Sequence, residues 1–228
     1  MKRRSVKIGV AVVALIALAA IFGPLIYAQF NDSPDSLVSQ RLVNDTLVTS
    51  ADLEGSWQID EGSVVGYRVD EKIALAETEA VGRTNAVTGV FEVADGVLQS
   101  AAFEVDMATF ASDRGQRDDQ FRTRIMDVAT FPTSTFTLTE TVVLPASTEV
   151  ATMDPFVAVG DLQLRGTTKS VAFEMFAAID EGRLRLTGST EIDFSDWGIP
   201  NPSLPAAFIF TSETGTLEFD LIFVPIEP

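Results

Sequence analysis

Two residue types that carry much of protein chemistry are missing from this chain of 228 residues, which contains no cysteine and no histidine. Without cysteine there is no disulfide, no thiol nucleophile and no lipid-modified cysteine near the N-terminus. Without histidine, Ser-His-Asp and Cys-His catalysis, histidine metal sites and the usual proton shuttle near neutral pH are excluded. Only carboxylates remain, and neighbours such as Asp118 and Asp119 point in different directions on a helix. We therefore predict a protein that is not an enzyme, with no catalytic residue, metal site or cofactor.

Basic residues are also scarce, with 16 Lys and Arg against 33 Asp and Glu and a formal net charge of −17 at pH 7. The basic residues before Ala28 all lie at the start of the chain, so the remainder is more acidic still. A body of that charge repels nucleic acid and anionic lipid surfaces at long range. We predict no nucleic-acid partner, and interpret the acidity as favouring solubility or growth in salt.

The first 28 residues have the pattern of a membrane anchor or a signal peptide. Basic residues precede an apolar run over 8–28, which has the length of a helix that crosses the hydrocarbon layer. The basic flank keeps the N-terminus in the cytoplasm, so the remainder is exported. A cleavage site after Ala28 would place Ile26 where a small residue is needed, which is a poor match. We predict an uncleaved single-pass anchor in the cell membrane; a periplasmic or secreted protein released by cleavage is the alternative.

Residues 29–52 form a polar linker, either a plain tether or a membrane-proximal helix, and residues 53–228 form one domain dominated by strands. Alternation of apolar and polar residues, with an Asp95-Gly96 turn, predicts ten short strands. Eight or more antiparallel strands in one domain avoid raw edges by closing into a barrel. The strands are expected over 57–60, 63–70, 89–93, 97–109, 133–143, 156–165, 170–179, 183–194, 208–211 and 215–225.

One helical pattern interrupts the strands, between Ser112 and Pro132. Ser112 or Asp113 is expected to cap its start, and Phe131-Pro132 to end it, because a residue before proline is pushed out of the helical region. Phe121 and Ile125 lie four residues apart on one face, with Met126 beside them. A single amphipathic helix among many strands predicts a barrel with a lid.

Five stretches carry a family resemblance. The first two are Trp57-Gln58-Ile59-Asp60 with Ser63, and Val87-Thr88-Gly89-Val90-Phe91. The third is the helical stretch with Arg117-Asp118-Asp119, Phe121-Arg122, Asp127-Val128, Phe131-Pro132-Thr133 and Thr135-Phe136. The last two are Gly160-Asp161-Leu162-Gln163-Leu164-Arg165-Gly166-Thr167-Thr168-Lys169 with Val171, and Ile192-Asp193 with Ser195-Asp196-Trp197-Gly198-Ile199. Together they resemble the YceI-like family of lipid-binding β-barrels over about residues 53–228.

The resemblance implies a closed, antiparallel, lipocalin-like barrel of about eight strands that holds a polyisoprenoid or another long-chain lipid noncovalently in a tunnel. It also implies that the chain can pair as a homodimer. The expected ligand contacts are inward-facing rings and aliphatic side chains, together with lid residues and one arginine for a polar head group: Phe91, Phe103, Arg117, Phe121, Ile125, Met126, Phe131, Phe136, Leu164, Phe173 and Trp197.

Three questions stay open from the residues alone. The 16 phenylalanines could fill the barrel as a dry core, and the chain would then be a protein-interaction module rather than a lipid carrier. The lid arginines could meet a head group or form ion pairs on the helix surface, where Asp118 and Arg122 have the four-residue spacing of such a pair. The run Asn201-Pro202-Ser203-Leu204-Pro205 is unusually rich in proline for the family, so the mouth of the barrel is expected to have its own shape.

Overall fold

The computed structural model describes residues 33–38, 50–74, 76–144, 156–180 and 183–227. The predicted anchor, residues 8–28, lies outside this part of the chain. Among the described residues, no helix has the length and apolar character needed to span a bilayer.

Eight antiparallel strands form a closed ring in the order β1-β4-β5-β7-β9-β10-β11-β13. The pairing of β1 with β13, which sets Trp57 opposite Pro225, closes the ring and confirms the predicted barrel. Closure leaves these strands without raw edges. The strands are β1 (Gly55–Ile59), β4 (Val87–Ala94), β5 (Val97–Asp106), β7 (Thr133–Leu138), β9 (Phe156–Leu164), β10 (Thr167–Asp180), β11 (Arg183–Asp193) and β13 (Thr214–Pro225).

The alternation seen in the sequence decides which residues point inward. On β11, Leu184 and Leu186 are buried, whereas Arg183 is exposed and Arg185 pairs with Asp220 on the outer face. The Asp95-Gly96 turn joins β4 to β5 as predicted, with both residues at positive φ (55° and 72°). This conformation matches the twist of a tight hairpin.

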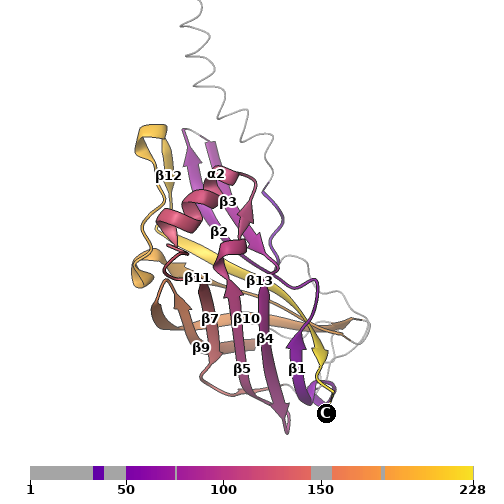
Figure 1. The fold of residues 1–228 in the computed structure, drawn as a ribbon. Coiled ribbons are helices and arrows are strands. Elements are labelled where there is room, and N and C mark those ends of the chain that lie inside the picture. Colours follow the sequence, from indigo (N-terminus) through magenta and orange to yellow (C-terminus); the bar gives the residue numbers. More distant parts are fainter. Residues whose placement is uncertain (1–32, 39–49, 75, 145–155, 181–182, 228) are drawn as a thin grey trace, which may run out of the picture.

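A second group of strands extends one end of the barrel, where β12 and the far ends of β2 and β3 lie opposite the C-terminus (Figure 1). Strand β2 (Val64–Ile73) pairs with the first part of β13 and along its other edge with β3 (Ala76–Thr84). Strand β3 was not predicted, because its polar and acidic residues hide the alternation. The short strands are β6 (Ala111–Ser112), paired with β3, β8 (Val142–Val143), paired with β5, and β12 (Ile209–Thr211), paired with β2.

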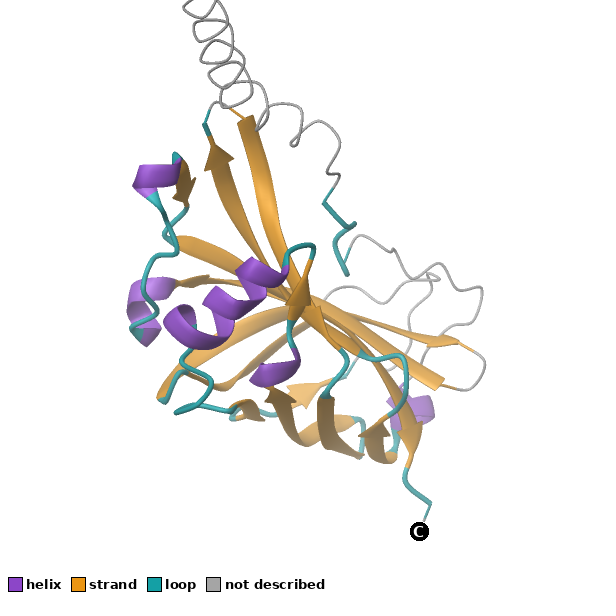
Figure 2. Ribbon diagram, turned by 45° about the horizontal axis from the view of Figure 1, so that its top comes forward, coloured by secondary structure: helices purple, strands orange, loops and turns teal. Residues whose placement is uncertain are grey.

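The predicted lid exists but is shorter than expected. Helix α2 (Gly115–Gln120) continues into the wider turn η3 (Phe121–Ile125) and ends there. Asp127, at φ 49°, then turns the chain, so Phe131-Pro132 does not end the helix. The predicted caps are also wrong: Ser112 belongs to β6, and its N–H donates to Asp118 over 2.8 Å. In Figure 2 the lid lies between the long β2–β3 hairpin and the strands of the ring.

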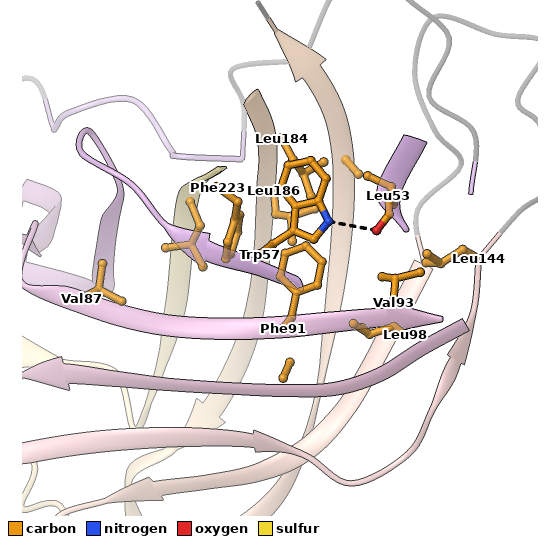
Figure 3. Close-up of a cluster of buried hydrophobic side chains, with 13 residues drawn as sticks. Leu53, Trp57, Val87, Phe91, Val93, Leu98, Leu144, Leu184, Leu186 and Phe223 are labelled. Atoms are coloured by element: carbon orange, nitrogen blue, oxygen red, sulfur yellow. Dashed lines mark hydrogen bonds between the residues drawn. The ribbon is translucent and has the colours of Figure 1, made fainter. Parts of the chain in front are cut away.

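The other end of the barrel is sealed by a dense apolar cluster (Figure 3). The turn η1 (Ser50–Leu53) brings Leu53 over this end of the ring of strands. The Trp57 indole donates to the Leu53 carbonyl over 2.9 Å. Trp57 stacks on Phe91, whose ring meets the edge of Phe223, a side chain with 0% exposure. The remaining helical turns are η2 (Met107–Thr109), η4 (Phe194–Trp197) and η5 (Pro205–Ala207).

Residues 33–38, ahead of the barrel, lie on its outer face against β2, β3 and β13. Leu37 is buried there, and both its N–H and the Ser36 hydroxyl donate to Glu218 Oε2, over 3.1 and 2.9 Å. The Glu218 side chain, with 0% exposure, also pairs with Arg68 at 3.0 Å and Arg83 at 3.2 Å. This segment of the linker therefore covers a buried ionic cluster on the barrel wall.

Candidate functional site

A cavity of about 250 Å³ lies inside the barrel. Almost every side chain that lines it is aliphatic or aromatic, and the lining reaches from Leu53 at the sealed end to Ile199 and Pro202 at the lid end. One water needs roughly 10–15 Å³ of such space, so there is room for a chain of on the order of twenty carbon atoms. Because the lumen is open, the predicted tunnel is present and the alternative of a solid phenylalanine core does not hold.

The rings form a belt around the wall instead of filling the lumen. Phe173 meets the ring edges of Phe136 at 5.4 Å and Phe219 at 5.6 Å between centroids, and Phe136 stacks with Phe103 at 6.4 Å. Phe103, Phe136 and Phe219 point inward and are still only half-buried. Their remaining exposed faces border the cavity.

Glycines on neighbouring strands explain how the rings lie flat. A Cβ at Gly188 would stand 2.5 Å from the Phe219 ring, and one at Gly89 would stand 2.2 Å from the Phe103 ring. Real Cβ atoms do not approach other atoms so closely. Each ring therefore folds down over a missing side chain, which keeps it against the wall and leaves the lumen open.

A glycine also lies under an aromatic ring at the lid end, where Gly82 faces Tyr67. Substituting this glycine tests whether the position of the ring controls ligand binding. A Cβ at Gly82 would meet the Tyr67 ring at 2.4 Å, and the nearest atoms all belong to that side chain. We expect Gly82→Ala to push Tyr67 toward the lumen and lower the amount of bound apolar ligand severalfold, with the fold retained. Circular dichroism of the purified protein reports whether the fold is retained, and quantitative solvent extraction measures the bound ligand.

Gly115→Ala is the matched control for this substitution. Gly115 begins α2, and no atom lies within 4 Å of the position of its Cβ. The control is expected to leave ligand content unchanged and to stabilise the helix by up to about 1 kcal/mol. Equal ligand content in wild type and Gly82→Ala would show that the position of the Tyr67 ring does not control access.

Nine of the eleven predicted contact residues line the cavity. The lid contributes Arg117, Phe121, Ile125 and Met126, of which Phe121 and Met126 are buried. Phe121 stacks on Tyr67 at 5.2 Å and packs against Phe110 at 5.1 Å. The strands contribute the other five: Phe91, Phe103, Phe136, Leu164 and Phe173.

Phe131 and Trp197 do not line the cavity. Phe131 packs over Gly166 in the β9–β10 turn, and the Arg165 guanidinium lies 6.0 Å from its ring centroid. Trp197 is buried at the lid end, where its indole donates to the Leu162 carbonyl over 3.4 Å. Both rings hold the turns around the barrel end, so they support the wall rather than border the lumen.

A polar group lies where the lid meets β2. Arg117 pairs with Glu71 at 3.1 Å and also with Asp113, and the side chains of Arg117 and Glu71 are 15% and 10% exposed. Burial alone would lower the pKa of Arg117, but the carboxylates of Glu71 and Asp113 outweigh it, so the pKa is raised. Burial raises the pKa of Tyr67, with Arg117 opposing it in part, so its hydroxyl stays protonated.

Tyr67 and Glu71 were missed among the predicted contacts, although both line the cavity. A signal for them existed. Tyr67, Val69 and Glu71 alternate along β2, so extending the predicted strand 63–70 by one residue would have placed a carboxylate on the inward face. Within the described part of the chain, the Tyr67 hydroxyl has no hydrogen-bond partner, which leaves it available to a ligand.

The lid arginines serve different purposes. Arg122 pairs with Asp119 at 2.9 Å on the helix surface, not with Asp118. Arg124 donates to the carbonyls of Asn201 and Pro202, over 3.5 and 3.0 Å, and so connects the lid to the proline-rich segment. Only Arg117 of the lid arginines reaches the cavity.

Comparison with known proteins agrees with this geometry. The sequence profile of the YceI-like domain matches residues 57–223, which is most of the chain. The chain belongs to the YceI-like family. No curated protein sequence matches it.

Solved structures share the fold of this YceI-like barrel at low sequence identity. A polyisoprenoid binding domain from Saccharophagus degradans, implicated in plant cell wall breakdown, superposes with a TM-score of 0.58 and 15% identity over 75% of this chain and 98% of its own. Burkholderia cenocepacia BcnA superposes with a TM-score of 0.55 and 17% identity, over 72% of this chain and 98% of its own. The Campylobacter jejuni YCEI protein superposes with a TM-score of 0.51 and 12% identity, over 64% of this chain and 85% of its own.

Proposed function

We propose that this YceI-like protein binds one long apolar lipid, such as a polyisoprenoid, inside its barrel and carries, stores or sequesters it. The observation that carries the proposal is the open, apolar lumen behind the lid. Each methylene moved from water into such a lining contributes about 0.8 kcal/mol, so a chain of isoprene units needs few polar contacts. The polyisoprenoid-binding domain from Saccharophagus degradans, which shares the fold, supports this choice of ligand.

We further propose that the barrel works outside the cytoplasmic membrane and stays tethered to it. The support is the apolar run over 8–28 with its basic flank. A carrier tethered in this way remains close to the bilayer from which an apolar lipid would come. Fractionation of cells that produce the full-length chain, with protease added outside the membrane, tests both orientation and tethering.

The direct test is to identify what the protein holds. Full-length protein is purified in detergent, extracted with organic solvent and analysed by mass spectrometry, with native mass spectrometry giving the stoichiometry. We expect one long apolar molecule per barrel. A purified protein that is empty, and that takes up no added prenol, would refute the proposal.

The charges at the lid support a neutral head group for the proposed lipid. Arg117 already faces two carboxylates, so a phosphate would have to displace at least one of them to gain an ion pair. A neutral head, such as a hydroxyl or a quinone oxygen, can bond to the Tyr67 hydroxyl, which has no partner among the described residues, without that cost. We therefore propose that prenols or prenyl quinones are bound in preference to prenyl phosphates.

Removing the Glu71 charge should change this preference. In Glu71→Gln, Arg117 keeps only Asp113 as a carboxylate partner, so the affinity for a prenyl phosphate relative to the matching prenol should rise about tenfold, equivalent to about 1.4 kcal/mol. Competition binding with the two lipids measures the ratio. Asp119→Asn removes the same charge at a side chain that is 76% exposed, and should leave the ratio unchanged. A wild-type preference for the phosphate would contradict the proposal.

A further inference from the structure

Two exposed rings lie at the end of the barrel that carries the lid. They belong to residues 201–211, which we call the flap, and which contain η5 and β12. Phe208 is 67% exposed and Phe210 is 48% exposed. Phe208 also has a φ of 56°, a left-handed conformation that is uncommon and costly for a bulky residue. The flap therefore presents two aromatic side chains to solvent from a turn in an unusual conformation.

The flap borders the polar end of the cavity, lined by Glu71, Arg117 and Pro202, which we call the mouth. Strand β12 pairs with the far end of β2, which sets Thr211 opposite Glu71 and Phe210 opposite Lys72. Pro202, at the other end of the flap, lines the cavity, and its carbonyl accepts from Arg124 of the lid. A surface that contacts Phe208 and Phe210 therefore lies next to the mouth of the cavity.

The docked N-terminal segment shows from which side the chain arrives. The Pro34 carbonyl accepts from Arg68, whereas Leu37 donates to Glu218, which lies opposite Gly66. Gly66 is two residues farther than Arg68 from the β2–β3 turn. Residues 33–38 thus run away from that turn, and their N-terminal end faces the end of the molecule that carries the flap (Figure 1).

The remaining chain is too short to reach the opposite end. Ala28, where the apolar run ends, is six residue steps before Pro34, and a fully extended chain of six steps spans about 20 Å. The five residue steps of β2 from Arg68 to Ile73 cover about 17 Å of the same path. The proposed anchor, residues 8–28, would therefore hold this end of the barrel beside the bilayer.

We propose that the flap docks on the extracytoplasmic face of a phospholipid bilayer, with Phe208 and Phe210 inserted at the interface and the mouth of the cavity facing the lipid. This rests on the tether in the proposed function. Insertion of apolar side chains supplies the contact, because a net charge of −17 opposes binding to anionic lipid. The matching partner is thus a zwitterionic bilayer such as phosphatidylcholine.

Docking in this orientation shortens the path of the ligand. A lipid that leaves the bilayer beside Phe210 reaches the mouth at Glu71 and Arg117 without crossing open water. Each methylene kept out of water avoids a cost of about 0.8 kcal/mol. The ring pair and the mouth therefore act as one surface, although they come from different parts of the chain.

The test measures the depth of the flap in the bilayer. The chain has no cysteine, so Lys72→Cys takes a single fluorescent label beside Phe210 while both rings stay in place. Full-length labelled protein is reconstituted in phosphatidylcholine vesicles in which part of the lipid has brominated acyl chains. The control label is at Val143→Cys, which is 78% exposed and pairs with Val97 at the sealed end of the barrel.

We expect bromine to quench the label at position 72 at least threefold more than the label at position 143. The difference should disappear when Phe208→Ser and Phe210→Ser are added. Equal quenching at the two positions, or quenching that survives loss of both rings, would overturn the proposal. Solvent extraction of the same samples reports bound lipid, so a protein that keeps its lipid but shows no quenching refutes the docking alone, whereas an empty protein refutes the proposed function.

Discussion

Ala158→Trp is expected to abolish lipid binding while the barrel still folds. Ala158 lies on the inward face of β9, opposite Phe173, and lines the cavity. An indole at this position projects into the lumen and takes the space that the lipid chain would occupy. We expect bound lipid to fall at least tenfold. Because the new ring fills a void instead of overpacking a dense core, any loss of stability should stay below the roughly 1–3 kcal/mol typical of overpacking.

The neighbouring residue gives a matched control. Val157 lies on the same strand, faces outward and is 52% exposed, so Val157→Trp adds the same ring outside the barrel. This control should keep its lipid. Ala177→Phe, on β10, blocks the lumen from another strand and should repeat the effect of Ala158→Trp. If both blocked variants kept wild-type lipid content, the ligand would have to bind elsewhere.

Glu218→Gln is expected to destabilise the fold by about 3–5 kcal/mol, the usual effect of removing one partner from a buried ion pair. The Glu218 side chain has 0% exposure and faces Arg68 and Arg83, whose side chains are 12% and 28% exposed. It also accepts from residues 36 and 37, so the substitution should loosen the docked segment as well. Urea denaturation gives the free energy of unfolding, and limited proteolysis reports release of the segment.

The control for Glu218→Gln is an exposed ion pair of the same chemistry. Asp196 pairs with Lys169 at 2.5 Å, with side chains that are 50% and 41% exposed. Asp196→Asn should cost less than about 1 kcal/mol, because water screens an exposed pair. A similar loss of stability in both variants would mean that the buried ion pairs of Glu218 stabilise the fold no more than an exposed ion pair does.

The strands of the ring were the most predictable part of the fold. On β10 and β11 the alternation is unbroken, and Phe173, Met175, Leu184 and Leu186 all point inward as predicted. Strand β3 was not predicted, because two glutamates and an arginine interrupt the alternation of apolar and polar residues along it. Its nine residues are held by pairing with β2 across a hairpin turn, an interaction between two strands that the periodicity of β3 alone does not report.

The candidate site was predictable in its apolar wall and less so at its mouth. Lid residues Phe121 and Ile125 were found because helical spacing brings them to one face. Helical spacing also made Asp118 and Arg122 a reasonable pair. The structure instead directs Asp118 to Ser112 and Arg122 to Asp119. Those partners depend on where β6 ends and how the chain enters α2.

By itself, the sequence determined which faces of the strands are apolar, that a single amphipathic helix interrupts them, and that chemistry based on histidine or cysteine is absent, because composition and period act locally. Only the tertiary structure decided that the barrel is hollow. Whether a ring fills the lumen or lies along the wall depends on the residue opposite it, as Gly188 shows for Phe219. The position of the mouth was decided in the same way, because Glu71, Arg117 and Pro202 lie far apart in the chain and meet only when the sheet closes.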